Sequence, residues 1–321
     1  MTAPGALTGR APYSVPPTGT PVRVAFVGQR TYFEACSVHR ELPGLVPTFI
    51  DFRGGANVGE MLATLTSFAP HVVVVFRPEI LPAGIFADLD AAVVGFTTEP
   101  LPRAGEPAHP LLVSNLAELD AADAGNFDRV ICFDPYGWDA AAERLPAWRC
   151  MPLPVDDRLF APVRPARQPP RALFIGFPTE HRQRYLGPVQ EEFDIVHYAH
   201  GLLGEDLRAA MAGADIGINL HGARWPLSFE NRVLLHLAAG HLLISEPLSP
   251  SFGLEPGLDF LEVADADDFS LRVHEAHAEP EAHHQVRVRG RHKAEQFRAS
   301  SVWPRVVRDL LEDLAAFGTA R

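Results

Sequence analysis

Short apolar runs alternate with amphipathic stretches along most of the chain. In the first half, the runs of strand length are "VRVAFVG" (22–28), "VPTFIDF" (46–52), "HVVVVFRP" (71–78), "AAVVGFTTEP" (91–100), "HPLLVSN" (109–115) and "FDRVICFD" (127–134). A helical spacing of apolar residues separates two of them at 57–68. Continuous apolar runs are typical of parallel strands that are buried on both faces. This half therefore predicts a parallel sheet with crossover helices.

The second half restarts the same pattern. "PRALFIGFPTEHR" (170–182) is similar to "PVRVAFVGQR" (21–30), because each has an apolar strand, a glycine and then polar and basic residues. The strands expected after it lie at 193–199, 214–220, 241–245 and 259–264. The stretch between the halves, 151–170, is dense in proline and has neither a helical nor a strand period. Such a composition is typical of a linker.

We therefore predict an α/β fold of two Rossmann-like, doubly wound domains that face a cleft. The expected parts are a disordered tail (1–20), an N-terminal domain (21–155), a linker (156–170), a C-terminal domain (171–299) and a C-terminal helix (300–321). The apolar residues that make this last helix amphipathic are Val306, Val307, Leu310, Leu311 and Leu314. Ligands of doubly wound sheets bind at the carboxyl ends of the strands.

Composition narrows the class of protein. Among 321 residues, 47% are hydrophobic and 21% are charged, which is typical of a globular chain. The net charge of −12 argues against a nucleic-acid partner, because a phosphate backbone needs a basic face. No apolar run is long enough to cross a membrane, and the first 20 residues lack the apolar segment of a signal peptide. Three widely spaced cysteines suit a reducing compartment, so we expect a cytoplasmic protein with free thiols.

The segment 219–240, "NLHGARWPLSFENRVLLHLAAG", contains an arginine in an unusual place. Ser228 is expected to cap a helix over 229–239 that Gly240 closes, which puts Arg232 in the first turn. The amino end of a helix favours anions and repels cations. Arg232 is easier to understand if an anion, such as a phosphate, binds there. The alternative is that Arg232 pairs with a nearby carboxylate.

A second anion-binding loop is expected after the first strand of the same domain, from Gly176 to Arg184. Two such loops at one edge of a sheet suggest a diphosphate ligand. Trp225 and the loop 198–201 are candidates for contacting a base or a sugar, as are His197 and His200. The candidate ligand-binding residues are Gly176, Thr179, His181, Arg182, Tyr198, Asn219, His221, Ser228, Glu230, Asn231 and Arg232.

Five segments carry a family resemblance, and they follow one another in the family's order. They are "PLPVDDRLFAP" (152–162), "ALFIGFPTEHRQRYL" (172–186), "ADIGINLHG" (214–222), "ENRVLLHLAAGHLLIS" (230–245) and "SSVWPRVVRDLL" (300–311). From about residue 127 to its end, the chain resembles glycosyltransferases of the GT-B architecture. The resemblance is greatest to the CgeB-like, spore-protein-related group of family-1-type transferases.

The resemblance implies transfer of a sugar from a nucleotide-diphosphate donor to an acceptor such as a glycan, a small molecule or a protein. It implies no cofactor and no metal held by an Asp-x-Asp motif. Carried over by position, Gly176 and Arg182 line the diphosphate loop, and Arg232 contacts phosphate oxygens. The family's glutamate, which binds the ribose hydroxyls, falls at Leu235, and leucine accepts no hydrogen bonds. This departure from the family predicts a weakened or altered donor site.

A general base, if the reaction inverts, is expected from the N-terminal domain. The candidates at strand ends are Glu99 and Asp134, with Glu99 preferred, and beyond them Glu79 and His39. No metal site is expected, because "HEAH" (274–277) lacks the H-E-x-x-H spacing. Two alternatives remain open: a nucleotide-sugar epimerase or hydrolase of the same fold, and a non-catalytic binding protein derived from a glycosyltransferase.

Overall fold

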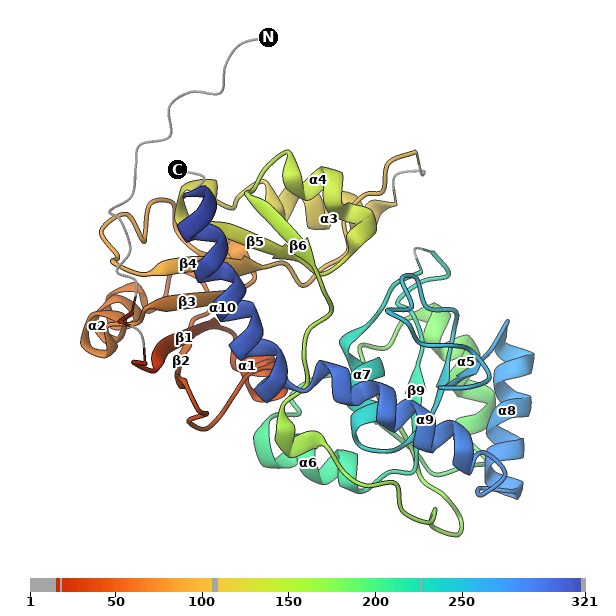
Figure 1. Cartoon of the computed structure of the whole chain (residues 1–321). Helices are drawn as coiled ribbons and strands as arrows, with labels where there is room; N and C mark the ends of the chain where they lie inside the picture. Colours follow the sequence, from red (N-terminus) through yellow and green to blue (C-terminus); the bar gives the residue numbers. More distant parts are fainter. Residues whose placement is uncertain (1–15, 18, 106–108, 226, 319–321) are drawn as a thin grey trace. The chain divides into compact units, whose positions relative to one another are not determined.

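A computed structural model describes residues 16–17, 19–105, 109–225 and 227–318, so most of the predicted tail lies outside the described residues. The chain divides into two compact units (Figure 1). Unit 1 takes its described residues from the stretches Met1–Phe33, Ser37–Met151 and Val302–Arg321. Unit 2 takes its residues from Glu34–Cys36 and Pro152–Ser301. Each unit is an α/β unit with one parallel sheet, as the sequence predicts.

Unit 1 is built on a six-stranded sheet with the order β2-β1-β3-β4-β5-β6, in which every pair is parallel. Its strands are β1 (Val22–Gly28), β2 (Leu45–Asp51), β3 (Val72–Phe76), β4 (Ala92–Phe96), β5 (Arg129–Cys132) and β6 (Ala147–Cys150). The helices that follow these strands are α1 (Arg30–Cys36), α2 (Val58–Phe68), α3 (Pro110–Leu119) and α4 (Trp138–Ala142). Short 3-10 helices lie at Pro78–Ile80, Ala124–Asn126 and Pro135–Gly137.

The predicted strand at 109–115 is wrong, because this stretch begins helix α3. His109 caps the helix, since its Nδ1 accepts a hydrogen bond from the backbone N–H of Leu111 at 3.2 Å. Pro110 occupies the first helical position, where its missing N–H costs no helical hydrogen bond. Leu112 and Leu119 are buried at helical spacing. A three-residue apolar run that looks like a strand is thus one turn of a helix.

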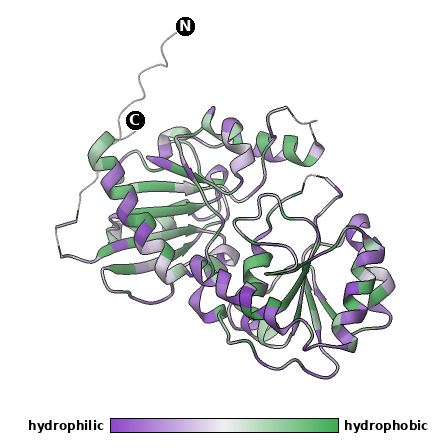
Figure 2. Ribbon diagram, turned by 45° about the vertical axis from the view of Figure 1, so that its right-hand side comes forward, coloured by the Kyte–Doolittle hydropathy of each residue, from purple (hydrophilic) through white to green (hydrophobic). Residues whose placement is uncertain are grey.

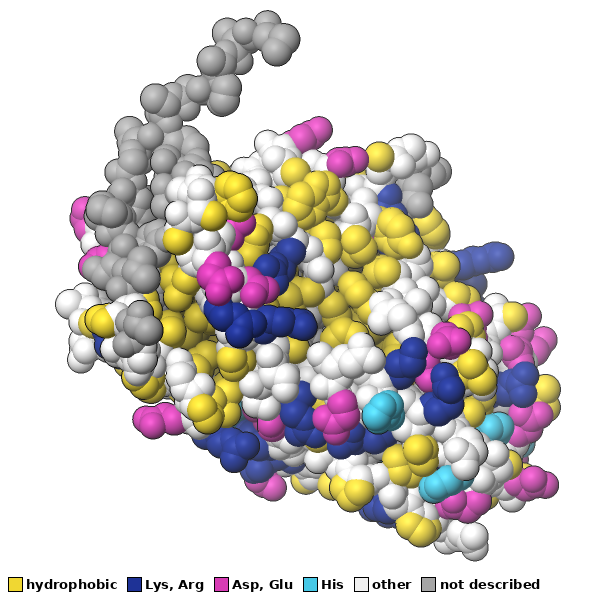
Figure 3. Space-filling view, in the orientation of Figure 1, with side chains coloured by type: hydrophobic (Ala, Val, Ile, Leu, Met, Phe, Trp, Pro, Cys, Tyr) yellow, Lys and Arg dark blue, Asp and Glu magenta, His cyan; other side chains and the backbone are white. Residues whose placement is uncertain are grey.

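The last helix, α10 (Ala299–Phe317), closes the core of unit 1. The indole of Trp303 is fully buried, and its ring centroid lies 5.1 Å from that of Phe26 and 6.0 Å from that of Phe76. On the solvent side, Asp309 accepts from Arg149 at 2.9 Å, and Asp313 accepts from Arg129 at 2.7 Å. Figure 3 shows acidic and basic side chains next to each other over this helix. The helix is therefore held by both apolar packing and ion pairs.

Unit 2 is built on a five-stranded parallel sheet with the order β11-β10-β9-β7-β8. Its strands are β7 (Ala172–Ile175), β8 (Ile195–Tyr198), β9 (Ile216–Asn219), β10 (Leu242–Ser245) and β11 (Leu261–Glu262). Its helices are α5 (Glu180–Gln190), α6 (Gly204–Ala212), α7 (Asn231–Ala238), α8 (Ala266–Ala278) and α9 (His284–Ala294), with 3-10 helices at Asp157–Leu159 and Glu295–Phe297. In Figure 2 the strands of both sheets are hydrophobic, and the helices carry polar residues on one side.

Two helix starts in unit 2 differ from the prediction. Thr179 caps α5 through the N–H of Arg182, so the expected loop 176–184 ends at Thr179. Ser228 does not cap α7; Glu230 is the N-cap residue, and the Ser228 hydroxyl lies 3.3 Å from Nδ1 of His221 instead. The chain stays extended at Glu230 (φ −91°, ψ 142°), which moves the helix start two residues along. Gly240 ends the helix at φ +75°, as predicted.

The described residues contain no helix that is long and apolar enough to span a membrane.

Candidate functional site

Arg232 is the second residue of α7, and its side chain is buried, with 8% of the residue exposed. Its Nε donates to Oδ1 of Asn219 at 3.0 Å, and its Nη1 donates to the carbonyl oxygen of Ile175 at 2.7 Å. Its Nη2 lies 2.5 Å from Oε2 of Glu230, two residues earlier in the chain. The guanidinium therefore joins the carboxyl ends of β7 and β9 to the start of α7.

Arg182, in the first turn of α5, lies beside Arg232. Its Nε donates to the carbonyl oxygen of Leu220 at 3.0 Å, and its Nη1 donates to that of Phe177 at 2.8 Å. Its Nη2 is 3.6 Å from the carboxylate of Glu230. Both guanidinium carbons lie 5.4 Å from the centre of the Phe174 ring. We call Arg182 and Arg232 the arginine pair, and Glu230 is the carboxylate that they share.

Gly176 makes room for this arrangement. A Cβ at this position would lie 2.8 Å from Nη1 of Arg232 and 3.3 Å from Nη1 of Arg182. Only glycine lets both guanidinium groups approach the backbone at the end of β7. The sequence placed Gly176, Arg182 and Arg232 in one site, and in the structure both guanidinium groups lie against the backbone of Gly176.

The charges of the three side chains are linked. Burial, and then the charge of Arg232, lower the pKa of Arg182 to about 10. Burial opposes ionisation of Glu230, but the charges of Arg232 and Arg182 outweigh it and hold its pKa below the ordinary value. Glu230 is therefore an anion between two cations. The anion that Arg232 requires at the helix start is supplied, in this structure, by the protein's own carboxylate.

Glu246 is a buried carboxylate next to this cluster that the sequence analysis missed. Its Oε1 lies 2.8 Å from Nε2 of His181, and its Oε2 accepts the backbone N–H of His221 at 2.6 Å. It follows β10 directly, at the same sheet edge as Asn219, whose side-chain amide donates to Ser245 at 2.9 Å. Its position just after the predicted strand 241–245 was the signal available in the sequence.

His221 is buried, and burial lowers its pKa, so the ring is neutral near pH 7. Its Nε2 donates to the carbonyl oxygen of Pro247 at 2.9 Å, which leaves Nδ1 to accept from the hydroxyl of Ser228. Asn231, the first residue of α7, donates from its side-chain amide to Sγ of Cys36 at 3.2 Å, within unit 2. Both side chains are engaged with protein groups in this structure.

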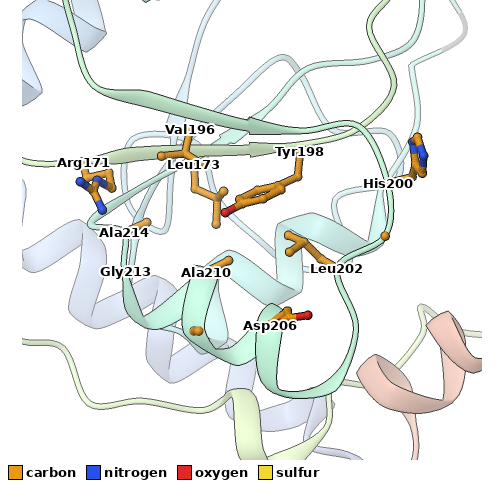
Figure 4. A pocket seen from close by; sticks show the side chains of 12 residues that line it. Arg171, Leu173, Val196, Tyr198, His200, Leu202, Asp206, Ala210, Gly213 and Ala214 are labelled. Atoms are coloured by element: carbon orange, nitrogen blue, oxygen red, sulfur yellow. The ribbon is translucent and has the colours of Figure 1, made fainter.

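The backbone and the ring of Tyr198 have different neighbours. Its backbone carbonyl accepts from the N–H of Gly176 at 2.9 Å, but its ring lines a hollow of about 530 Å³ beside α6. Apolar residues form most of this wall, as Figure 4 shows: Leu173, Val196, Leu202 and Ala210. His197, one position earlier, points to the Phe174 side, where its Nε2 bonds the carbonyl of Gly176 at 2.7 Å.

The two candidate bases are in unit 1, after β4 and β5. Asp134 is buried; its Oδ1 accepts from the N–H of Tyr136 at 2.9 Å, and its Oδ2 lies 3.5 Å from Nη2 of Arg103. Both oxygens of this carboxylate therefore face groups of the protein. Glu99 is half-buried in the loop after β4, and its charge acts on Arg77.

The remaining two candidates are occupied. Glu79 accepts from Nε of Arg77 at 2.7 Å, and His39 bonds the carbonyl of Phe33 at 3.1 Å. In the described part of the chain, no group of three or more histidine, cysteine or acidic side chains is placed to hold a metal ion.

Comparison with known proteins gives a fold but no close relative. Models of protein families and the curated proteins give no match to this chain. Among solved structures, sucrose-phosphate synthase from Thermosynechococcus elongatus is 12% identical, with a TM-score of 0.56 over 91% of this chain and 99% of that chain. A glycosyltransferase from Rickettsia africae is 9% identical, with a TM-score of 0.56 over 92% and 99%. Anabaena HepE in complex with UDP-glucose is 9% identical, with a TM-score of 0.52 over 92% and 100%.

The chain has the GT-B fold. The expected architecture, with two Rossmann-like units, is thereby confirmed. The narrower resemblance to the CgeB-like group stays a prediction. Within the GT-B fold, the arginine pair belongs to the second unit, at the carboxyl ends of β7 and β9.

Proposed function

We propose that this chain is a glycosyltransferase that takes a sugar from a nucleotide-diphosphate donor and passes it to an acceptor. The observation that carries the proposal is the arginine pair, because two buried guanidinium groups share a single carboxylate at the edge of a parallel sheet. This edge is where doubly wound sheets bind ligands. HepE, which has the same fold, is known as a complex with UDP-glucose, and this supports a nucleotide-sugar donor here.

In this proposal the diphosphate replaces the carboxylate of Glu230. A diphosphate carries more negative charge than one carboxylate, so it compensates the two cations more fully. As the bond to the sugar breaks, the leaving diphosphate gains charge, and the positioned guanidinium groups stabilise that charge. No step needs a metal ion or a cofactor.

Glu99 is our candidate for the general base of an inverting reaction. Asp134 is disfavoured because its carboxylate is buried against Arg103 and caps the turn at Tyr136. The side chain of Glu99 is half-buried on the loop after β4. We expect Glu99→Gln to abolish transfer and leave nucleotide binding unchanged.

A second candidate function is a non-catalytic binding protein with this fold. The Nε, Nη1 and Nη2 groups of both arginines already contact acceptors within the protein. A guanidinium group so engaged can serve to hold β7, β9 and α7 together. Leu235, at the position of the family's ribose-binding glutamate, favours the same alternative.

Titration calorimetry separates the two candidates. The wild type is titrated with UDP, GDP, ADP and dTDP and with inorganic pyrophosphate, next to Glu230→Gln and Arg232→Ala. The matched control is Arg184→Ala, because Arg184 is an exposed arginine of the same helix as Arg182, paired with Glu180. We expect at least one nucleoside diphosphate to bind the wild type and the control equally.

We expect Glu230→Gln to bind that nucleotide about tenfold more tightly, because a charge-assisted hydrogen bond within the protein, worth about 1.5–3 kcal/mol, no longer competes with the ligand. Arg232→Ala should lose binding. If neither the wild type nor Glu230→Gln binds any of these ligands, the transferase proposal is wrong and the non-catalytic candidate stands.

A further inference from the structure

Two of the three cysteines lie side by side in unit 1. Cys132 ends β5 and Cys150 ends β6, and the two residues are direct partners in the parallel register of these strands. Neighbouring strands are about 4.8 Å apart. The Cα atoms of a disulfide are usually about 4.4–6.8 Å apart. The spacing of the two strands therefore lies within the Cα range of a disulfide.

The side chains of the pair also meet. Partners in a parallel register point to the same face of a sheet, and both cysteines belong to the same apolar cluster, which also contains Ala141 and Leu145. Each of the two thiols affects the pKa of the other. Cys132 is buried, with 1% exposed, whereas Cys150 is partly exposed. Cys150 is thus the more accessible residue of the two.

The interaction between the two thiols shifts their pKa values in opposite directions. The S–H of Cys132 stabilises a thiolate at Cys150, and this is the largest cause that lowers the pKa of Cys150. The interaction with Cys150, and then burial, raise the pKa of Cys132. A thiolate is the reactive form of cysteine. Cys150 is therefore the sulfur that reacts first with an oxidant, and Cys132 reacts second.

We propose that Cys132 and Cys150 form a reversible disulfide when the protein meets a hydroperoxide. The thiolate of Cys150 attacks one oxygen of the peroxide, the O–O bond breaks, and the other oxygen leaves as water or an alcohol with a proton. Cys150 is then a sulfenic acid. The sulfur of Cys132 attacks it, the S–S bond forms, the S–O bond breaks, and the oxygen leaves as water with the thiol proton of Cys132. The two electrons lost by the sulfur pair reduce the peroxide.

The modification site lies beside the loop that contains Asp134, since β5 ends at Cys132. Asp134 acts electrostatically on both thiols. A disulfide there fixes the ends of β5 and β6 to each other. The site does not depend on the proposed transferase activity, because it uses no residue of the arginine pair.

The test uses the full-length protein, treated with hydrogen peroxide and then alkylated under denaturing conditions. Intact mass and peptide mapping are read before and after reduction by dithiothreitol. We expect the loss of two hydrogen atoms, a peptide linked through Cys132 and Cys150, and full reversal. Cys36 is the matched internal control: it is buried, and burial raises its pKa to about 12, so it should stay alkylatable.

Three variants complete the test. Cys36→Ser should form the disulfide as the wild type does. Cys150→Ser should leave Cys132 unoxidised, and Cys132→Ser should give a sulfenic acid at Cys150 that dimedone traps. If Cys132→Ser does not fold, the contrast between Cys36→Ser and Cys150→Ser decides alone. The proposal is wrong if peroxide leaves both thiols of the wild type free, oxidises Cys36 first, or links Cys150 only between two molecules.

Discussion

The buried pair His236 and His241 leads to a prediction on acid stability. Nε2 of His241 lies 2.8 Å from the carbonyl of Met211, so this nitrogen carries the hydrogen. Its Nδ1 is then an acceptor, and Nδ1 of His236, 3.0 Å away, donates to it. Nε2 of His236 is left bare and buried, with no hydrogen-bond partner among the described residues. A proton added there would create an imidazolium without an acceptor. A Cβ on Gly217 would lie 2.3 Å from the His236 ring, so this glycine makes space for the pair.

The size of the expected loss of stability follows from the pKa values of the two imidazole rings. Burial is the largest cause that lowers the pKa of His241 from 6.5 to about 4. The nearby charges of Asp215, Arg164 and Arg287 contribute less. One pKa unit is worth about 1.4 kcal/mol, so His241 alone contributes roughly 3 kcal/mol. Burial, then His241 and Arg232, lower the pKa of His236 further.

The direction in which pH changes the free energy of unfolding depends on whether the folded or the unfolded chain binds protons at the higher pH. As the pH falls below about 6.5, the unfolded chain protonates both histidines while the folded chain keeps them neutral. Unfolding therefore becomes easier between about pH 6.5 and pH 4, by up to about 1.4 kcal/mol per pH unit for each histidine. This contribution to stability is fully present above pH 6.5.

The assay is urea unfolding followed by circular dichroism at about pH 7, 5.5 and 4.5. The test variant replaces His236 by Leu and His241 by Gln, whose amide still donates to the Met211 carbonyl. The control is His292→Gln, because His292 is an exposed residue of α9. The double variant lacks both histidines, each worth about 1.4 kcal/mol per pH unit over roughly two pH units, so we expect wild type and control to lose about 5 kcal/mol more than this variant on acidification. Equal losses in all three proteins would refute the reasoning, since carboxylates common to all would then explain the whole effect.

Three glycine substitutions test the packing of unit 2. A Cβ at Gly290 would lie 2.3 Å from the backbone oxygen of Asp259, so we expect Gly290→Ala to destabilise the protein by about 2–3 kcal/mol in urea unfolding. Gly187→Ala, in a helix with open space around it, should be neutral or stabilising, and a similar loss there would contradict the packing argument. A Cβ at Gly176 would displace the guanidinium of Arg232. We expect Gly176→Ala to abolish the thermal shift given by a nucleoside diphosphate and to lower stability by about 1 kcal/mol; an unchanged shift would argue against this site.

Much of the fold could be read from the sequence because the strands are uniformly apolar. The run 22–28 is strand β1 without adjustment, and the runs at 71–78 and 241–245 contain β3 and β10. The helix at 110–119 was missed because its apolar residues happen to be contiguous at 111–113. Strand β6 was missed because "AWRC" has only four residues and contains an arginine.

The candidate site was only partly predictable, because its partners come from separate strands. The sequence brought Gly176, Arg182 and Arg232 together through the edge rule for parallel sheets. It did not indicate that Glu230 would lie between the two guanidinium groups, since that depends on an extended residue before α7. It did not single out Glu246 either, because a carboxylate after a strand is common and only the fold places it against His181.

The route of the chain through its two units has a consequence for how the protein is made. A ribosome releases residues 16–151 first, but the aromatic rings of Phe26 and Phe76 meet Trp303 only after residues 302–317 have emerged. The stretch Pro152–Ser301, which with Glu34–Cys36 makes up unit 2, is finished before that. We therefore expect unit 2 to complete its fold before unit 1, although most of unit 1 is translated first. Until α10 has emerged, the apolar surface that this helix covers in unit 1 stays exposed.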